Sequence, residues 1–318
     1  MTGRSRPRAI RIRWVRTLAG ANLLIAAALV LGAAPVTAKQ FNGWDAAVPE
    51  TAINSPSADG CPIESPNGRH LYIASNRPGT LGGNDIWVAH RKNPKSPWST
   101  PENLGPPVNT EFADFCPTPL GDGWLLFVSE RPGPGTCNAG PGKGDMYIVR
   151  QRENGQWTTP RHLGCDASGT GPNFPGGEFG PSLVRTRQGT FLFFSSDGYG
   201  ADMNIYMSRR RADGSFAQAT LVDELNTAFA DFMPNVRRDG LEVVFNSNRP
   251  GGQGGQDVYT SSRRRTSDPW SLPVNVGSTV NTAGNETRSS LSGDGKRLHF
   301  GRDGEIYVSQ RSRGGAGD

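Results

Sequence analysis

The sequence predicts an all-β protein, a five-bladed β-propeller whose last blade is completed by the amino-terminal strand. An aromatic residue followed by a polar stretch, an Asn-containing turn and an acid occurs five times, at Trp44, Trp98, Trp157, Phe216 and Trp270. Four of these motifs end a longer unit of strand-like segments. The motif at Trp44 has no unit before it, and the last unit, which opens at Ser289, has no motif after it. The amino-terminal motif can therefore complete the carboxy-terminal unit, which favours a closed ring over a linear solenoid.

The repeated units have the length and turn chemistry of propeller blades. They open at Pro62, Pro117, Pro181, Pro234 and Ser289, with spacings of 55, 64, 53 and 55 residues. Each contains four short segments rich in β-branched or aromatic residues, and Asn-Gly or Asp-Gly pairs such as Asn67-Gly68 supply the positive φ of tight hairpins. No helical periodicity follows residue 38. We expect residues 41–50 to pair beside "EIYVSQR" and protect both open edges of the ring.

The first 38 residues resemble an export signal. Six arginines and no acid precede the apolar stretch "LAGANLLIAAALVLGAA", which ends in small residues. We therefore expect residues 1–38 to be a signal peptide and residues 39–318 a single propeller domain. A retained membrane anchor is the alternative, because the stretch is close to the length of a membrane span. The mature protein would be periplasmic or extracellular, a monomer without a membrane association.

The charge balance argues against nucleic-acid binding. The formal net charge is +5, but removal of the six signal arginines leaves a mature chain near −1. The basic character belongs to the export signal, so it is no argument for a nucleic-acid partner. None of the four cysteines forms a Cys-x-x-Cys pair, and no histidines have ligand spacing, so we expect neither a metal site of that type nor a cofactor.

Several segments resemble a known repeat family. "Ser75-Asn76-Arg77-Pro78-Gly79", "Ser247-Asn248-Arg249-Pro250-Gly251-Gly252" and "Asn84-Asp85-Ile86-Trp87-Val88" are similar to the WD40-like (PD40) repeats of TolB-type propellers. The resemblance covers about residues 41–311 and implies a propeller fold. It says little about function, because such repeats serve many exported proteins. We expect no counterpart of the amino-terminal domain that TolB itself carries.

Arginines and acids recur at the two ends of the Gly-rich loop between the second and third strands. A residue that recurs in every blade is expected to hold the blade together, and an arginine–carboxylate pair would pin each loop. We therefore expect structural loop pairs. The residues are Arg77 with Asp85, Arg131 with Asp145, and Arg249 with Asp257.

A second set of acids stands three residues before each strand opener, where the chain enters the innermost strand. These residues are Asp59, Asp114, Glu178, Asp231 and Glu286. Five carboxylates converging on the channel mouth would need a cation, and calcium is the natural candidate. Alternatively, each acid caps its own turn by accepting backbone N–H bonds. The set is the candidate ligand- or ion-binding site of the sequence.

Four cysteines map to the same face, near blades one and two. Two long insertions in blade two, "RPGPGTCNAGPGKGD" and "CDASGTGPNFPGGEFG", each carry one cysteine. An exported chain permits disulfides, so we expect Cys137–Cys165, with Cys61–Cys116 as the second bridge. Loop insertions on one face of a repeat array often mark its binding face.

The sequence thus favours a non-catalytic binding propeller that recognises a protein or glycan on the face bearing the acids and the blade-two loops. The alternative is a five-bladed glycoside hydrolase or lyase that acts at the channel mouth. That chemistry requires two acids in unlike environments, whereas these acids are near-equivalent by repeat. No catalytic residue is assigned. A site with two unlike acids would favour the enzyme, and five equivalent acids would favour binding.

Overall fold

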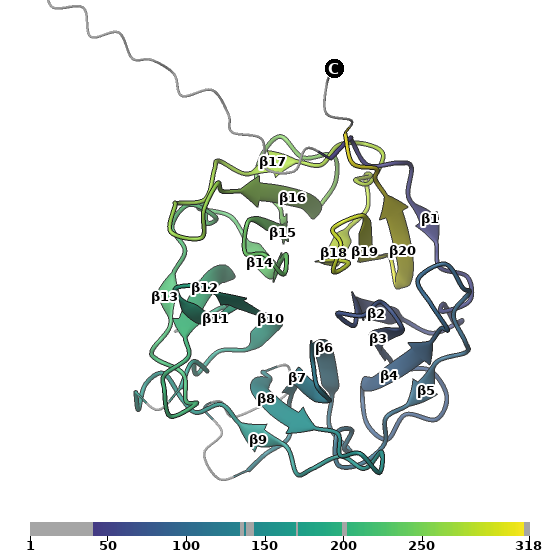
Figure 1. The fold of residues 1–318 in the computed structure, drawn as a ribbon, viewed down its shortest axis with the longest axis vertical. Coiled ribbons are helices and arrows are strands. Elements are labelled where there is room, and N and C mark those ends of the chain that lie inside the picture. The colour runs from purple at the N-terminus through teal and green to yellow at the C-terminus, as the bar shows by residue number, and fades with distance from the viewer. Residues whose placement is uncertain (1–40, 134–136, 138–142, 170, 199–201, 315–318) are drawn as a thin grey trace, which may run out of the picture. The chain divides into compact units, whose positions relative to one another are not determined.

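Five four-stranded antiparallel sheets surround a central axis in the computed structural model (Figure 1). The structure describes residues 41–314 except 134–136, 138–142, 170 and 199–201, so the expected signal peptide lies outside the described residues. The described residues form no helix of the length and apolarity that a membrane span requires. The chain is therefore a five-bladed β-propeller, as the sequence predicts.

In blades one to four the strands follow the chain from the axis outward. Blade one contains β2 (Asp59–Glu64), β3 (His70–Ser75), β4 (Asp85–His90) and β5 (Glu102–Asn103). Blade two contains β6 (Asp114–Gly121), β7 (Trp124–Ser129), β8 (Asp145–Arg150) and β9 (Arg161–His162). Blade three contains β10 (Glu178–Thr186), β11 (Gly189–Ser196), β12 (Asn204–Arg209) and β13 (Thr220–Leu221). Blade four contains β14 (Asp231–Val236), β15 (Glu242–Ser247), β16 (Asp257–Ser262) and β17 (Val274–Asn275).

Blade five joins the two ends of the described chain. It contains β18 (Glu286–Leu291), β19 (Arg297–Arg302), β20 (Glu305–Gln310) and β1 (Val48–Pro49), in the order β1-β20-β19-β18. Val48 is paired with Val308 and Pro49 with Tyr307, so the amino-terminal strand closes the ring. The closing strand is shorter than the expected residues 41–50, because only two residues of that segment run in register with β20.

Trp44 occupies the place that the other tryptophans occupy in their blades. The ring of Trp44 is buried against Leu298 and Phe300. The Arg311 guanidinium carbon lies 4.2 Å from the Trp44 ring centroid, as Arg263 lies 4.0 Å from Trp270. Such cation–π stacking explains why an aromatic residue recurs at this point of the repeat.

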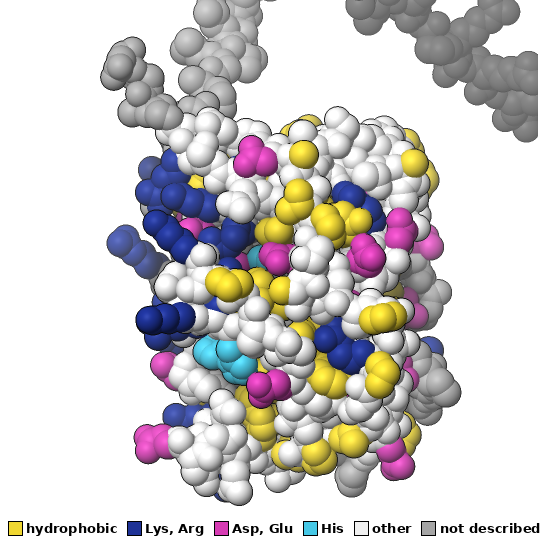
Figure 2. Space-filling view, turned by 90° about the vertical axis from the view of Figure 1, so that its right-hand side faces the viewer, with side chains coloured by type: hydrophobic (Ala, Val, Ile, Leu, Met, Phe, Trp, Pro, Cys, Tyr) yellow, Lys and Arg dark blue, Asp and Glu magenta, His cyan; other side chains and the backbone are white. Residues whose placement is uncertain are grey.

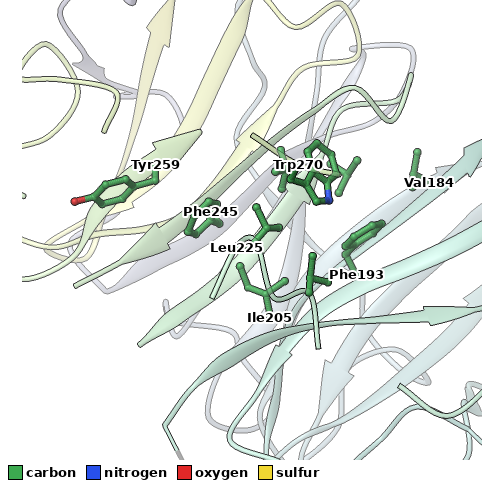
Figure 3. Close-up of a cluster of buried hydrophobic side chains, with 10 residues drawn as sticks. Val184, Phe193, Ile205, Leu225, Phe245, Tyr259 and Trp270 are labelled. Atoms are coloured by element: carbon green, nitrogen blue, oxygen red, sulfur yellow. The ribbon is translucent and has the colours of Figure 1, made fainter. Parts of the chain in front are cut away.

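The core lies between neighbouring blades rather than at one centre. Between blades three and four, Phe193, Ile205, Leu225, Phe245 and Trp270 form one buried cluster (Figure 3). Strands buried on both faces account for apolar runs without strict alternation. Each blade is therefore stabilised by its neighbours, which is why the ring must close.

Candidate functional site

The five acids of the expected ring begin the five innermost strands, and all are buried. Each accepts a hydrogen bond from a backbone N–H four residues earlier. Asp59 accepts one from Ser55 at 2.6 Å, Asp114 one from Thr110 at 2.7 Å, and Asp231 one from Thr227 at 2.6 Å. The carboxylates thus cap the turns that lead into their own strands, as one of the two expectations had it.

An arginine neutralises four of these five carboxylates. Arg77 contacts Asp59 at 2.6 Å, Arg131 contacts Asp114 at 2.8 Å, Arg249 contacts Asp231 at 2.5 Å and Arg302 contacts Glu286 at 2.9 Å. An Nη atom of each arginine also donates to a backbone carbonyl of the same turn, such as Ile53 or Leu225. These carboxylates need no calcium ion to balance their charge.

The expected arginine–acid loop pairs have different partners. Arg77, Arg131 and Arg249 pair with the acids of the ring, and not with Asp85, Asp145 and Asp257. Asp85 instead accepts from Leu81 N at 2.8 Å and Asn103 Nδ2 at 2.7 Å, and Asp257 accepts from Gln253 N at 2.6 Å and Asn275 Nδ2 at 2.7 Å. These two acids stabilise the Gly-rich loop, because each accepts a hydrogen bond from a backbone N–H group of that loop. The arginine, at the loop's other end, reaches the turn of the inner strand.

Glu178 of blade three is the exception. Oε1 accepts from Phe174 N at 3.0 Å and Ser196 Oγ at 3.0 Å, while Oε2 has no hydrogen-bond partner within the described part of the chain. Gly198 stands where blades one, two and four carry their arginine, and Ser196 stands where blade five carries Arg302, so neither position of blade three supplies a guanidinium to this carboxyl. Burial, together with the charges of Asp145 and Asp197, raises the pKa of Glu178 well above its usual value. One acid of the five therefore has an environment unlike the rest.

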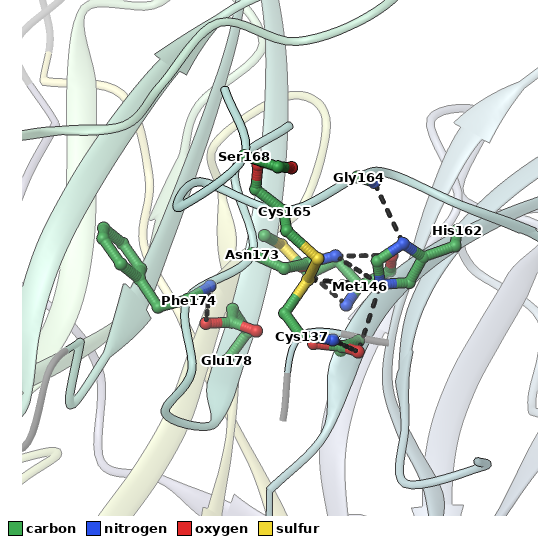
Figure 4. The surroundings of a disulfide bond; sticks show 10 residues. Cys137, Met146, His162, Gly164, Cys165, Ser168, Asn173, Phe174 and Glu178 are labelled. Carbon is green, nitrogen blue, oxygen red and sulfur yellow. Dashed lines mark hydrogen bonds and ion pairs between the residues drawn. A yellow bond between two sulfur atoms is a disulfide. The ribbon is translucent and has the colours of Figure 1, made fainter. Parts of the chain in front are cut away.

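The blade-two insertions are joined by a disulfide beside Glu178 (Figure 4). Cys137 and Cys165 are bonded, with Cα atoms 5.5 Å apart, as the sequence predicts. His162 lies beneath the bridge: Gly164 N donates to its Nδ1, which leaves Nε2 to face Asp145 Oδ2 at 3.1 Å. The second expected bridge does not form: Cys61 and Cys116 are both free cysteines. These two residues lie in the channel lining and not in the blade-two loops.

Sequence reasoning missed a basic face on the opposite side of the propeller. Strands β4, β8, β12, β16 and β20 end there, and basic residues follow in every blade. The exposed cations there include Arg69, Lys92, Arg150, Arg152, Arg187, Arg209, Arg210, Arg211, Arg238, Arg264, Arg265, Lys296 and Arg313. They gather along one edge of the space-filling view (Figure 2). The signal was present as "RK", "RQR", "RRR", "RRR" and "RSR" at one repeat position, but the net charge near −1 of the expected mature chain concealed it.

These cations have few competing charges. Among the described residues, none of the thirteen forms an ion pair, although the face also carries exposed Asp122, Glu153, Asp213, Asp239 and Asp294. Asp239 is already paired with the buried Arg237 at 2.9 Å, and Asp213 bonds Ser215. Clustered like charges on one face create a field that attracts counter-ions. This basic face is the candidate binding surface.

Comparison with known proteins identifies the fold and no family. No protein-family model matches the chain, and no curated protein resembles it in sequence. An endo-arabinase from Bacteroides thetaiotaomicron has a TM-score of 0.56 at 14% identity, with 87% of this chain and 100% of that chain covered. An α-L-arabinofuranosidase from Lactobacillus brevis has a TM-score of 0.51 at 11% identity, with coverages of 83% and 94%.

A putative TolB from Agrobacterium tumefaciens has a TM-score of 0.46 at 14% identity, with coverages of 82% and 78%. At such identities the likeness extends to the fold alone, and the resemblance to TolB-type repeats is not strengthened. What the chain shares with these proteins is the architecture of a β-propeller.

Proposed function

We propose that this protein binds an acidic polysaccharide on its basic face. The observation that carries the proposal is that each of the five blades places unpaired, exposed cations on that face. Arginine recognises carboxylates through paired N–H donors, and several such contacts on one chain add avidity. This proposal puts the ligand on the face opposite to the one expected from sequence. On the expected face all five acids are buried, and four of them are paired with arginines.

An exposed aromatic ring supports a sugar polymer over other polyanions. Trp124 begins β7 at the basic face and is 39% exposed. The Arg150 guanidinium carbon lies 5.6 Å from its ring centroid. A flat apolar ring beside a cation offers one surface for the C–H face of a sugar and one charge for its carboxylate.

The test is affinity electrophoresis or calorimetry with polygalacturonate, using neutral dextran as the matched uncharged polymer. We expect binding to polygalacturonate alone, weakening as salt screens the charges. Arg264→Glu and Trp124→Ala should each weaken it. Lys143→Glu, the same change of charge at an exposed residue of the other face, should not. Equal binding to dextran, or equal loss in Lys143→Glu, would overturn the proposal. Preferential binding to anionic phospholipid vesicles would replace the polysaccharide with a membrane surface.

A glycoside hydrolase is the second candidate, favoured by two observations. An endo-arabinase and an α-L-arabinofuranosidase share the fold with TM-scores above 0.5. Burial raises the pKa of Glu178, which no arginine contacts, whereas Asp59 and Asp114 are each held by an arginine, and an acid–base pair requires two carboxyls in unlike environments. Against it, all three carboxyls are buried away from solvent. Release of reducing sugar from arabinan, abolished by Glu178→Gln, would establish the enzyme; intact arabinan would exclude this activity.

A further inference from the structure

The five innermost strands each carry a β-bulge at the same point of the repeat, around the central axis. Pairing with the second strand shifts register there in every blade. The residue at each bulge has a left-handed φ between 46° and 59°, and such bulges re-aim a side chain. These residues are Cys61, Cys116, Gly180, Met233 and Arg288.

The bulges meet across the axis, although they come from five blades. Cys61, Cys116 and Met233 pack together in one hydrophobic cluster. A Cβ atom on Gly180 would lie 2.6 Å from Met233 Cα and 2.8 Å from Arg288 Nη1. The glycine of blade three therefore leaves the space that the Arg288 guanidinium fills, and Arg288 is the only cation among the five.

Arg288 is a buried cation without an ion pair among the described residues. It is 1% exposed, and its Nη2 donates to Thr118 Oγ1 at 3.0 Å and to Pro181 O at 3.3 Å. Within the described chain, Nε and Nη1 have no hydrogen-bond partner. Because a guanidinium has five N–H donors, the three on Nε and Nη1 have no acceptor there.

An acceptor for these donors has to carry a negative charge. A water molecule would accept the hydrogen bonds, but it would leave a positive charge uncompensated in a buried site, which is costly. Glu178 is the inner-strand acid without an arginine, but its carboxyl accepts from Phe174 and Ser196 and not from Arg288. An anion from solvent supplies both the acceptor and the charge.

The surroundings select a small anion with a single charge. One guanidinium balances one negative charge, and the other four bulge residues offer no second cation. Phosphate, sulfate and carboxylates bring several oxygens that each need a donor, whereas a thiol donates weakly and a thioether does not donate. Cys61 and Met233 are partly exposed and Arg288 is buried, so an anion would enter past sulfur side chains.

We propose that the central channel binds one chloride ion at Nε and Nη1 of Arg288. Arg288 belongs to blade five, whereas the acceptors of its Nη2 belong to blade two, through Thr118, and to blade three, through Pro181. The ion holds the guanidinium in place, and the guanidinium connects three blades across the axis. Chloride is therefore a structural ligand that stabilises the closed ring.

The experiment is thermal melting of the whole protein at constant ionic strength, with sodium chloride replacing sodium gluconate. We expect the melting temperature to rise by about 2–3 °C for each tenfold increase in chloride above its dissociation constant, because the ion binds the folded state. Arg288→Gln should abolish this rise. Arg264→Gln, which removes a cation of the basic face, should keep it. Crystals grown in sodium bromide should show an anomalous scatterer beside Arg288, a measurement that needs no variant.

Three results would overturn the proposal. The first is a chloride response that Arg288→Gln retains or Arg264→Gln loses, since the ion would then bind outside the channel. The second is a bromide crystal with water and no anomalous scatterer beside Arg288. The third is a melting temperature that does not depend on chloride; ultraviolet absorption of a thiolate at neutral pH would then assign the counter-charge to Cys61 or Cys116. None of them bears on polysaccharide binding, which is tested separately.

Discussion

Glu178 shows how the loss of one partner changes a repeated residue. Its four counterparts are contacted by arginines, but one oxygen of the buried Glu178 carboxyl has no hydrogen-bond partner among the described residues. The ionised form of Glu178 loses hydration without gaining a cation, so its pKa is raised. The same repeat position therefore carries a carboxyl paired with an arginine in four blades and a carboxyl with a raised pKa in blade three.

Glu178→Gln is expected to stabilise the protein at high pH only. The folded state keeps a proton that the unfolded state releases above a pKa of about 4.3. Between that pH and the raised pKa of Glu178 the folded state binds more protons, so stability falls as pH rises. Glutamine removes this slope. The melting temperature should match wild type at pH 4 and exceed it at pH 8.

Glu286→Gln is the matched control, because Glu286 is equally buried but paired with Arg302. It should destabilise the protein at pH 8, by roughly 3–5 kcal/mol for a broken buried pair. Equal effects of the two substitutions would contradict a raised pKa of Glu178.

The partner of Arg249 can be identified by a double-mutant cycle. Arg249→Ala should cost roughly 3–5 kcal/mol, since it leaves Asp231 buried and unpaired. Adding Asp231→Asn should recover part of that loss, while Asp257→Asn should add to it independently. Urea denaturation measures both cycles. Coupling to Asp257 in place of Asp231 would restore the pairing expected from sequence.

At the scale of elements, blade two is held by a covalent link that the other blades lack. Its two insertions leave the sheet at different points, and the Cys137–Cys165 bridge joins them over a separation of 28 residues. A side-chain hydrogen bond also connects the second insertion to β8, since Asn173 Oδ1 accepts from Met146 N at 2.9 Å. Asn109 and Asn281 make the same bond in their blades, to Ile86 and Val258. The asparagine is thus common to the repeat and the disulfide is specific to the insertions.

Replacing both bridging cysteines by serine should destabilise the protein by about 3 kcal/mol, because the unfolded chain regains loop entropy. Differential scanning calorimetry without reductant measures the loss. Adding reductant to wild type should reproduce it and should leave the serine variant unchanged. A variant as stable as wild type would mean that the insertions are held by Asp145, His162 and Asn173 alone.

At the scale of the whole molecule, the ring depends on a short amino-terminal strand. Two residues of β1 pair with β20, and Trp44 fills the cluster of blade five. Without them, β20 would present an unpaired edge and the cluster would open to water.

Deleting residues 41–49 is therefore expected to cause aggregation and a large fall in melting temperature. Size-exclusion chromatography and thermal melting check this. Leu272→Ser, a loss of apolar surface at a residue that is 86% exposed, should change neither. A deletion variant that stays monomeric and melts like wild type would show that the other four blades do not need the closing strand.

The sequence by itself determined the architecture, because its evidence is local and periodic. Turn pairs such as Asp122-Gly123, recurring aromatics such as Trp44 and the unequal chain ends specify strands, blades and closure. The Cys137–Cys165 bridge also followed, since both residues lie in insertions of one blade. These features depend on spacing along the chain, which a single sequence contains.

Only the tertiary structure decided which groups meet. Arg77 and Asp59 are 18 residues apart and Arg288 and Thr118 are 170 apart, so no repeat pattern pairs them. The isolation of Glu178 depends on an arginine that blade three does not have. The basic face and the sulfur-lined channel arise because the ring brings one residue of every blade to the same height around one axis. Distances across that axis are set by packing between blades, and packing leaves no signal in the order of the residues.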